Sequence, residues 1–167
     1  MNVPPGHKVI QEGRARILYP ADEDGDVPVS SLHFFAFLAP FQLGLVIPHK
    51  LTTNLKKAFY NPAQVFNRDL SCAVLEEFGA VVEQERKEKN WEHEPMTVIE
   101  ALSASGLRAC RYALECEGVK QVIANDLSVL AVDEIRKNAK FNQVDHLITP
   151  NKDDAIDLMA RHRTKET

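Results

Sequence analysis

Several features that mark whole classes of protein are scarce or missing in this sequence. It has three cysteines among 167 residues, and they form no Cys-x-x-Cys pair. The six histidines are scattered, without the spacing of metal ligands. These absences argue against a disulfide framework and a structural zinc site, and they favour a reducing compartment. We expect no metal and an intracellular location, the nucleus being favoured over the cytoplasm and the mitochondrion.

No charge sign dominates the sequence either. Twenty Lys and Arg residues stand against 24 Asp and Glu residues, for a net charge of −4. A nucleic acid would therefore need a local basic patch, or a part of the protein that is not present. Residues 1–16 are polar, which argues against a signal peptide. The chain has no internal repeat, and its length suits one domain with a sizeable core.

One long apolar stretch, residues 32–48, suits no regular element. Its apolar residues follow neither a helical nor a strand period, and Pro40 interrupts it. Its length is near the lower limit for a membrane helix, and His33 and Gln42 lie inside it, so a membrane span is disfavoured. A buried hydrophobic insertion, or a segment with no native place in the fold, is favoured. We expect residues 21–57 to pack poorly.

The segment from His7 to Tyr19 suggests a hairpin, because apolar pairs flank a polar centre and Gly13 provides a tight bend. In the simpler interpretation, this hairpin lies across a sheet edge. In a sharper one, Arg14 or Arg16 faces a ligand or RNA. The sequence leaves both open.

A long amphipathic helix is expected after Pro62, from about Asn67 onward. Arg68 lies at its start, where the helix dipole disfavours a cation. That placement points either to a bound anion or to an ion pair with Asp69 or another neighbour. The apolar positions fall on one stripe, with glutamates elsewhere: Leu70, Val74, Phe78, Val81 and Val82.

Three strand–helix units follow. The first is an apolar strand with Ile99, Ala101 and Leu102, then a turn at 103–106 and a helix at 107–115. The second is a strand at 121–126 and a helix from its N-cap Ser128 through Asn142. The third is a strand at 147–150, a turn at 151–154 and a helix from Ala155 to Arg161. Successive units of this kind predict a parallel sheet with right-handed crossovers.

Ligands of such sheets bind beyond the carboxyl ends of the strands, where this sequence places the 103–108 turn, Asp126 and the 153–155 turn. Gly106 suits a close approach of the backbone, and the acid at the end of the second strand suits ribose hydroxyls. Each feature also has a simpler explanation. Asp126 could cap the next helix, and Asp154 could be an N-cap. Their joint placement favours a nucleoside ligand.

The kind of nucleoside follows from the turn. A dinucleotide site needs Gly-x-Gly-x-x-Gly, whereas this turn has one glycine, which disfavours a nicotinamide-dependent oxidoreductase. Arg108 offers a guanidinium that can clamp a carboxylate with two parallel hydrogen bonds. S-adenosylmethionine has a ribose, an adenine and a carboxylate but no phosphate, so it fits better.

The chain resembles the tRNA guanine-26 N2-dimethyltransferases, a family of class I S-adenosylmethionine-dependent methyltransferases. The most specific stretches are Asn-Arg-Asp-Leu-Ser at 67–71 and Ala-Leu-Ser-Ala-Ser-Gly-Leu-Arg at 101–108. The other matching stretches are Gln11–Ile17, Phe59–Pro62, Ala124–Asp126, Asp154-Ala155 and Leu158-Met159. The resemblance covers roughly residues 8–20 and 58–160, and it implies an incomplete Rossmann-like sheet preceded by a hairpin and a helix.

The resemblance also implies residue roles. Arg68 and Arg108 would contact the methionine end of the cofactor, Asp126 the ribose, and Asp154 and Ala155 the adenine. Gly106 would belong to the cofactor turn. The reaction would transfer two methyl groups to N2 of a guanine in tRNA, and that base would have to leave its stack. No catalytic residue is assigned, because the family's Asp-Pro-Phe-Gly motif is expected beyond Thr167.

Two departures from the family pattern follow. Residues 21–57 interrupt it, and the Asp-Pro-Phe-Gly strand is missing, which leaves the sheet with an unpaired edge. We expect this chain alone to be inactive; the alternative is a non-catalytic module that binds cofactor or a partner. Four regions are expected: a hairpin region at 1–20, an insertion at 21–57, a helical lead-in at 58–94 and a partial cofactor-binding domain at 95–167.

Overall fold

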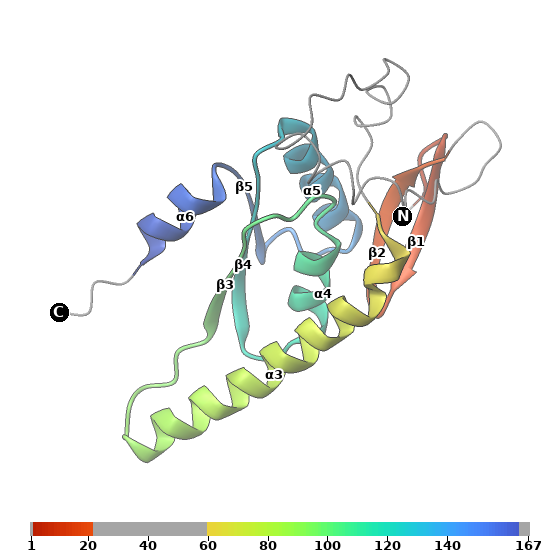
Figure 1. The fold of residues 1–167 in the computed structure, drawn as a ribbon. Coiled ribbons are helices and arrows are strands. Elements are labelled where there is room, and N and C mark those ends of the chain that lie inside the picture. The colour runs from red at the N-terminus through yellow and green to blue at the C-terminus, as the bar shows by residue number, and fades with distance from the viewer. Residues whose placement is uncertain (1, 22–59, 164–167) are drawn as a thin grey trace.

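The computed structural model describes residues 2–21 and 60–163 of this chain (Figure 1). Almost all of the expected insertion at 21–57 therefore lies outside the described residues. Among those that are described, no helix is long and apolar enough to cross a membrane. The elements in chain order are β1 His7–Glu12, β2 Ala15–Pro20, η2 Pro62–Gln64, α3 Val65–Glu88, β3 Met96–Glu100, α4 Leu107–Glu115, β4 Val119–Asp126, α5 Val129–Phe141, β5 Ile148–Lys152 and α6 Ala155–His162.

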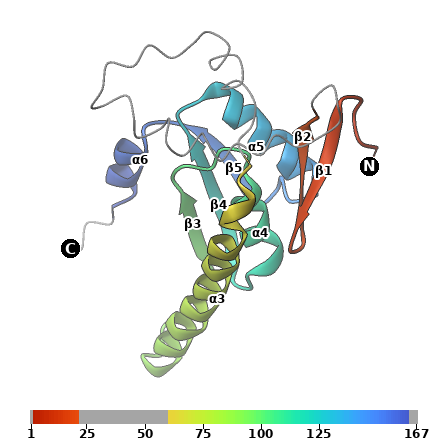
Figure 2. The same ribbon diagram turned by 45° about the vertical axis from the view of Figure 1, so that its right-hand side comes forward.

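Strands β3, β4 and β5 form a parallel sheet in that order, with β4 in the middle. Each strand is followed by a helix, so the three predicted strand–helix units and the partial Rossmann-like sheet are confirmed. Helices α4 and α5 lie between the sheet and the hairpin, whereas α6 lies on the other side (Figures 1 and 2). The core is formed where α4 and α5 meet β4, around Cys110, Val122 and Ile135.

Two strand boundaries differ from the prediction at the carboxyl edge of the sheet. The first strand ends at Glu100, so Ala101 and Leu102 lie beyond it, and Leu102 is 70% exposed. The third strand runs on to Lys152, because Asn151 and Lys152 still pair with β4. Apolar content alone predicted these ends wrongly, since hydrogen bonding to the neighbouring strand decides where a strand stops.

The predicted hairpin is confirmed: β1 and β2 pair antiparallel through a turn at Gly13, whose φ is +55°. It does not lie across a sheet edge, however. Its inner strand β2 packs on α4 and α5, and buried amides of α5 bind its backbone. Asn138 Oδ1 accepts a hydrogen bond from the Leu18 N–H at 2.8 Å, and Asn142 Oδ1 accepts one from the Arg16 N–H at 2.8 Å.

Of the two hairpin arginines that could face a ligand, Arg16 has a side-chain partner within the chain and Arg14 is held through its backbone. The Arg16 guanidinium lies over the Phe141 ring, 5.2 Å from its centroid. The Arg14 backbone N–H donates to the Glu115 carboxylate at 2.8 Å. These contacts favour the structural role of the hairpin.

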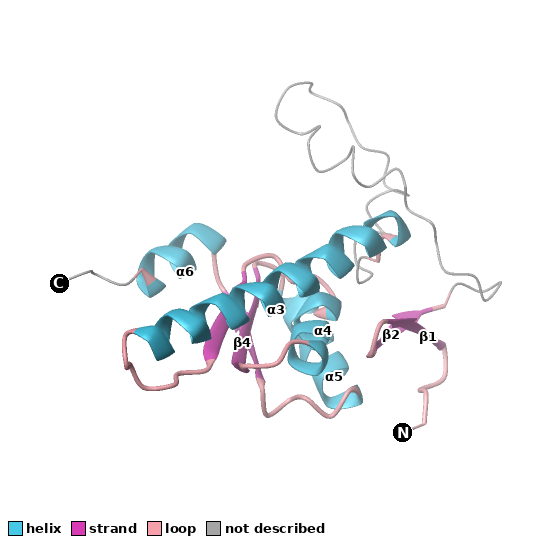
Figure 3. Ribbon diagram, turned by 90° about the horizontal axis from the view of Figure 1, so that it is seen from below, coloured by secondary structure: helices cyan, strands magenta, loops and turns pink. Residues whose placement is uncertain are grey.

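Helix α3 begins at Val65, two residues earlier than predicted, after a single 3-10 turn that Asn61 caps by accepting from the Ala63 N–H. Its only fully buried residues are Arg68 and Cys72. The predicted apolar stripe exists, but most of it faces outward. Seen from below, α3 crosses in front of α4 and the sheet (Figure 3). No described element covers the outer side of this helix.

Replacing Asn138 tests the attachment of the hairpin. Its buried side chain accepts from Leu18 and donates to the Ser105 carbonyl at 2.9 Å, so it joins β2, α5 and the 103–106 turn. Asn138→Ala leaves both backbone groups without a partner and should lower the free energy of unfolding by about 2 kcal/mol in urea denaturation. Lys140→Ala, at an exposed position of the same helix, is the matched control; equal effects would contradict this role.

Candidate functional site

Three loops meet at the carboxyl edge of the sheet, and Asn125 near the end of β4 joins them. Its side chain is fully buried and donates to the carbonyls of Ala101 and Asp153, both at 3.0 Å. Its Oδ1 accepts from the Asn151 side chain at 2.7 Å. Its backbone carbonyl accepts from the Ser103 N–H at 2.8 Å. One amide side chain thus fixes the loops after all three strands relative to one another.

Asp126, which is predicted to bind the ribose, follows Asn125 in the chain and accepts hydrogen bonds from two backbone amides. Its Oδ2 accepts from the Ala104 N–H at 3.0 Å and its Oδ1 from the Ser128 N–H at 2.9 Å. The second contact lies at the start of α5, where the Ser128 side chain makes no capping bond. The alternative role of Asp126 in capping this helix is therefore present in the structure. Its carboxylate is also held against the 103–106 turn.

Gly106 precedes α4 with φ of +75°, a conformation that L side chains rarely adopt. A Cβ here would lie 3.1 Å from Cγ1 and 3.2 Å from Cα of Ile135. The close approach that the sequence predicts at this glycine is therefore to helix α5. The glycine lets the 103–106 turn lie against that helix.

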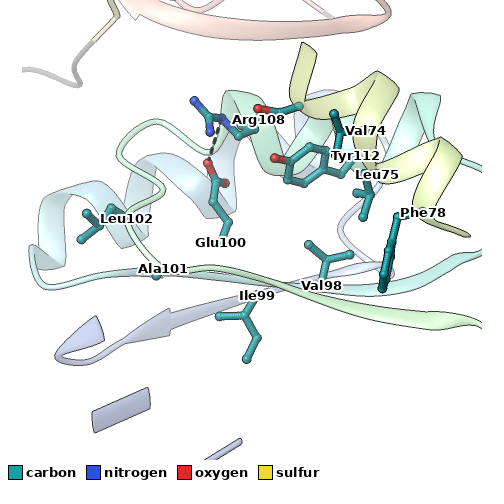
Figure 4. Close-up of a pocket in the computed structure, with 11 residues that line it drawn as sticks. Val74, Leu75, Phe78, Val98, Ile99, Glu100, Ala101, Leu102, Arg108 and Tyr112 are labelled. Carbon is teal, nitrogen blue, oxygen red and sulfur yellow. Dashed lines mark ion pairs between the residues drawn. The ribbon is translucent and has the colours of Figure 1, made fainter. Parts of the chain in front are cut away.

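Arg108 and Glu100 form a pair of opposite charges at the end of β3. Arg108 Nε lies 3.8 Å from Glu100 Oε1, and Arg108 Nη2 donates to Asn67 Oδ1 at 2.8 Å. The Glu100 side chain is only 12% exposed, and its Oε2 accepts no hydrogen bond. Burial raises the Glu100 pKa to about 7, against the opposing influence of Ser103 and Arg108. Figure 4 shows the two side chains turned toward each other.

Arg68 is buried and already paired. Its Nε and Nη2 donate to the two carboxylate oxygens of Glu12, both at 2.6 Å, and Nη2 also reaches the Asn61 carbonyl at 3.1 Å. Its guanidinium lies 5.3 Å from the centroid of the Tyr60 ring. The structure therefore shows the ion-pair alternative, but the partner of Arg68 is Glu12 of the hairpin and not Asp69. Asp69 pairs with Arg111 at 2.6 Å.

Two adjoining cavities lie along this region. The smaller, of about 180 Å³, is lined by both predicted arginines, Glu100 and the 103–105 turn, with Tyr60 at one side. The larger, of about 770 Å³, lies between α3 and β3 and shares Glu100, Leu102 and Arg108 with the first. Glu100 and Arg108 therefore lie between the smaller cavity and the larger one, which is the groove beside α3.

Asp154 and Ala155 begin α6, after the third strand. Asp154 Oδ1 accepts from the Ile156 N–H at 2.8 Å and the Asp157 N–H at 3.4 Å, so the predicted N-cap alternative is what the structure shows. Neither residue lines the smaller cavity. Their loop is nevertheless tied to the other two, because Asn125 binds the neighbouring Asp153 carbonyl.

The structure thus brings Arg68 and Arg108 to one cavity and joins the loops of Gly106, Asp126, Asp154 and Ala155 at the same edge. Sequence reasoning missed Glu100 and Asn125. A carboxylate that ends an apolar strand was a usable signal for Glu100. No group of acidic, histidine and cysteine side chains suited to a metal occurs in the part of the chain that the structure describes.

A parallel sheet with converging loops at its carboxyl edge places the chain in the class of Rossmann-like α/β domains. Comparison with known proteins narrows the class. Residues 45–166 match the family model described as N2,N2-dimethylguanosine tRNA methyltransferase. Because the match covers most of the chain, this chain belongs to that family.

Individual relatives agree with this assignment. The human tRNA (guanine(26)-N(2))-dimethyltransferase is 36% identical over 151 residues, covering 64% of this chain and 23% of its own length. The Drosophila melanogaster enzyme of the same name is 40% identical over 131 residues, covering 60% and 23%. A solved structure of Trm1 from Pyrococcus horikoshii with S-adenosyl-L-methionine has a TM-score of 0.56 at 27% identity, covering 92% of this chain and 32% of that one. The chain spans about a quarter of the length of these curated relatives.

Asn125→Asp should loosen all three loops at once. The acid has nearly the shape of the amide, but its carboxylate cannot donate to the Ala101 and Asp153 carbonyls and would face both of them while buried. We expect a loss of about 3 kcal/mol in the free energy of unfolding, measured in urea. Gln143→Glu makes the same change of group at an exposed position and should cost little. A similar small effect for both variants would refute the joining role of Asn125.

Proposed function

We propose that this chain binds S-adenosylmethionine at the carboxyl edge of its sheet and works in the dimethylation of N2 of guanine 26 in tRNA. Membership of the family and the names of the relatives support the reaction. The S-adenosyl-L-methionine in the Pyrococcus horikoshii structure supports the cofactor. The observation that carries the proposal is the junction at Asn125, which joins the three loops that would hold sugar, base and amino-acid end.

The adenosine part of the cofactor would lie along the ends of β4 and β5. The Asp126 carboxylate accepts hydrogen bonds from two backbone N–H groups, which leave it other lone pairs for ribose hydroxyls. Asp154 would accept from the exocyclic amine of adenine, and the Ala155 backbone would flank the ring. Gly106 would let the turn approach the cofactor from the other side.

The amino-acid end of the cofactor carries a carboxylate and an ammonium, and the smaller cavity offers a charge for each. Arg108 would clamp the carboxylate, as its planar guanidinium suits. Glu100, whose Oε2 accepts no hydrogen bond, would take the ammonium. Arg68, which Glu12 holds in place, would provide a second positive charge for the carboxylate from across the cavity.

The cofactor supplies a methyl group on a positively charged sulfur. The described residues would bind and orient it, so that its methyl faces an incoming guanine amine. That amine is a weak nucleophile because its lone pair is delocalised into the ring, so alignment must supply much of the rate. None of the described residues is assigned as the group that accepts its proton.

A second candidate is a module that binds cofactor without turning it over. The described residues include groups that would bind the cofactor, but none that is assigned as the acceptor of the amine proton, which favours this candidate. Transfer of labelled methyl groups from S-adenosylmethionine to tRNA separates the two candidates. We expect binding without turnover for the isolated chain.

Asp126→Asn tests the ribose role by calorimetry with S-adenosylmethionine. The change keeps an acceptor for one of the two backbone N–H groups, turns an NH2 group toward the other and removes the charged acceptor for the hydroxyls. Affinity should therefore fall roughly tenfold, about 1.4 kcal/mol. Asp145→Asn, at an exposed position before β5 at the opposite edge of the sheet, should leave affinity unchanged. Equal affinity for all three proteins would rule out the assigned role.

The pH dependence of binding tests Glu100. Because the Glu100 pKa is raised to about 7, this carboxyl is protonated in the free protein below that pH and cannot pair with an ammonium. Affinity for S-adenosylmethionine should therefore rise as pH increases through 7, and Glu100→Gln should flatten the rise. Arg108, Asp126, Tyr112 and Cys110 lie near Glu100, and the comparison with Glu100→Gln separates any contribution of theirs from that of Glu100.

Methylthioadenosine, which lacks the amino-acid end, is the matched ligand for this experiment. Its binding should depend little on pH and should be the same for the Glu100→Gln variant. If both ligands show the same rise with pH, the ammonium role of Glu100 is wrong, although the adenosine site would stand.

A further inference from the structure

The Glu12 carboxylate, at the end of β1, lies between two arginines that belong to different helices. Both of its oxygens accept from Arg68 of α3 at 2.6 Å, and Oε1 also accepts from Arg111 of α4 at 2.9 Å. The bonds from Arg68 come from its Nε and Nη2, which sets the plane and the direction of its guanidinium. Because Arg68 lines the smaller cavity, a residue of the hairpin decides how this cation faces a ligand there.

Arg111 is the fixed member of this group. Its Nη1 also donates to Asp69 at 2.6 Å and its Nη2 to Glu115 at 2.8 Å, and its side chain is 5% exposed. Arg68 depends on Glu12 far more, since no other carboxylate in the described part of the chain pairs with it. Both guanidinium groups bond to the same oxygen of Glu12, so without that negative charge they would repel each other at short range. Arg68 is therefore the group that would move.

Pairing with Glu12 has two opposite effects on the way Arg68 would bind an anion. It offsets part of the positive charge, which weakens the attraction. It also holds the Arg68 side chain, which is 9% exposed, in one conformation, so little rotamer freedom remains to be lost when a ligand binds. The second effect should dominate, because the charge gained by removing Glu12 would lie on a guanidinium that Arg111 has displaced. A clamp of two parallel hydrogen bonds tolerates little displacement.

We propose that Glu12 is a positioning residue for the carboxylate of S-adenosylmethionine and acts through Arg68, so that attachment of the hairpin and binding of the cofactor's amino-acid end reinforce each other. This inference rests on the proposed cofactor function of the cavity. Thermodynamic linkage makes the effect reciprocal. If the bond between Glu12 and Arg68 raises the affinity for the cofactor, the bound cofactor tightens the attachment of the hairpin by the same factor.

Calorimetry with the full 167-residue chain and two ligands tests this inference. S-adenosylmethionine has the carboxylate, whereas methylthioadenosine lacks the whole amino-acid end. Glu12→Gln removes the charge with little change of shape, and affinity for S-adenosylmethionine should fall roughly tenfold. Affinity for methylthioadenosine should stay within about twofold of wild type, which general damage to the fold would not allow. Glu117→Gln, the same change at an exposed position before β4, should leave both affinities unchanged.

Two further variants show whether Glu12 acts through Arg68. In an Arg68→Met background, Glu12→Gln should change affinity for S-adenosylmethionine by less than about twofold, because the group that it positions is gone. Glu12→Asp keeps the charge beside both arginines but shortens the side chain, so it cannot make all three hydrogen bonds. Should Glu12→Gln fail to fold, Glu12→Asp takes its place and should lower affinity for S-adenosylmethionine alone, by roughly threefold.

Hydrogen exchange of the hairpin amides measures the reciprocal effect. At equal saturation, the amides of β1 and β2 should exchange more slowly with S-adenosylmethionine bound than with methylthioadenosine bound. Glu12→Gln should abolish this difference, because it removes the bond that connects the hairpin to Arg68. The same exchange rates with both ligands in the wild-type chain would contradict the coupling.

The two ligands also separate failure of this inference from failure of the proposed function. Equal losses of affinity for both ligands would make Glu12 a structural residue and overturn the inference, as would unchanged or higher affinity of Glu12→Gln for S-adenosylmethionine. In these cases the wild-type chain still binds the cofactor, so the proposed function stands. A wild-type chain that binds neither ligand refutes the proposed function, and this inference with it.

Discussion

The buried side chain of Asn125 is the constraint on which the rest of the carboxyl edge depends. It can do this because an amide carries two donors and an acceptor in one plane, and the three are used on Ala101, Asp153 and Asn151. The large apolar side chains of these loops, Leu102 and Leu127, are 70 and 64% exposed, so they do little to hold the loops in place. Their relative positions therefore depend on polar bonds that must be satisfied once water is excluded.

A buried group of ion pairs holds the hairpin against α3 and α4. Glu12, only 6% exposed, accepts from both Arg68 and Arg111, and Arg111 also pairs with Asp69 and Glu115. Burial opposes the charge of Arg111, but the hydrogen bonds that its guanidinium donates to these carboxylates keep its pKa above the ordinary value. Buried charges are tolerated only when they are paired in this way. One consequence is that a residue of the hairpin sets the position of Arg68, 56 residues away, which lines the smaller cavity.

The polar edge and the apolar groove adjoin each other, and their different characters follow from the sheet. At the carboxyl ends the strands stop, which leaves backbone groups and acidic side chains to meet a ligand. On the side of β3 away from β4, no described strand pairs with it, which leaves apolar side chains and unpaired backbone groups there. Glu100 and Arg108 lie where the two surfaces meet, so whatever covers the groove also decides how much water reaches the charged pair.

The sequence by itself determined the order of elements, the parallel sheet, the hairpin and the sheet edge at which three loops meet. These depend on local patterns: apolar periods, the glycine at Gly106 and acids that follow strands. Only the tertiary structure decided that Arg68 pairs with Glu12, that Glu100 is buried, and that the α3 stripe faces outward. The physical reason is that burial and pairing depend on which distant segments meet, and an amphipathic period shows that a helix has an apolar face without showing what covers it.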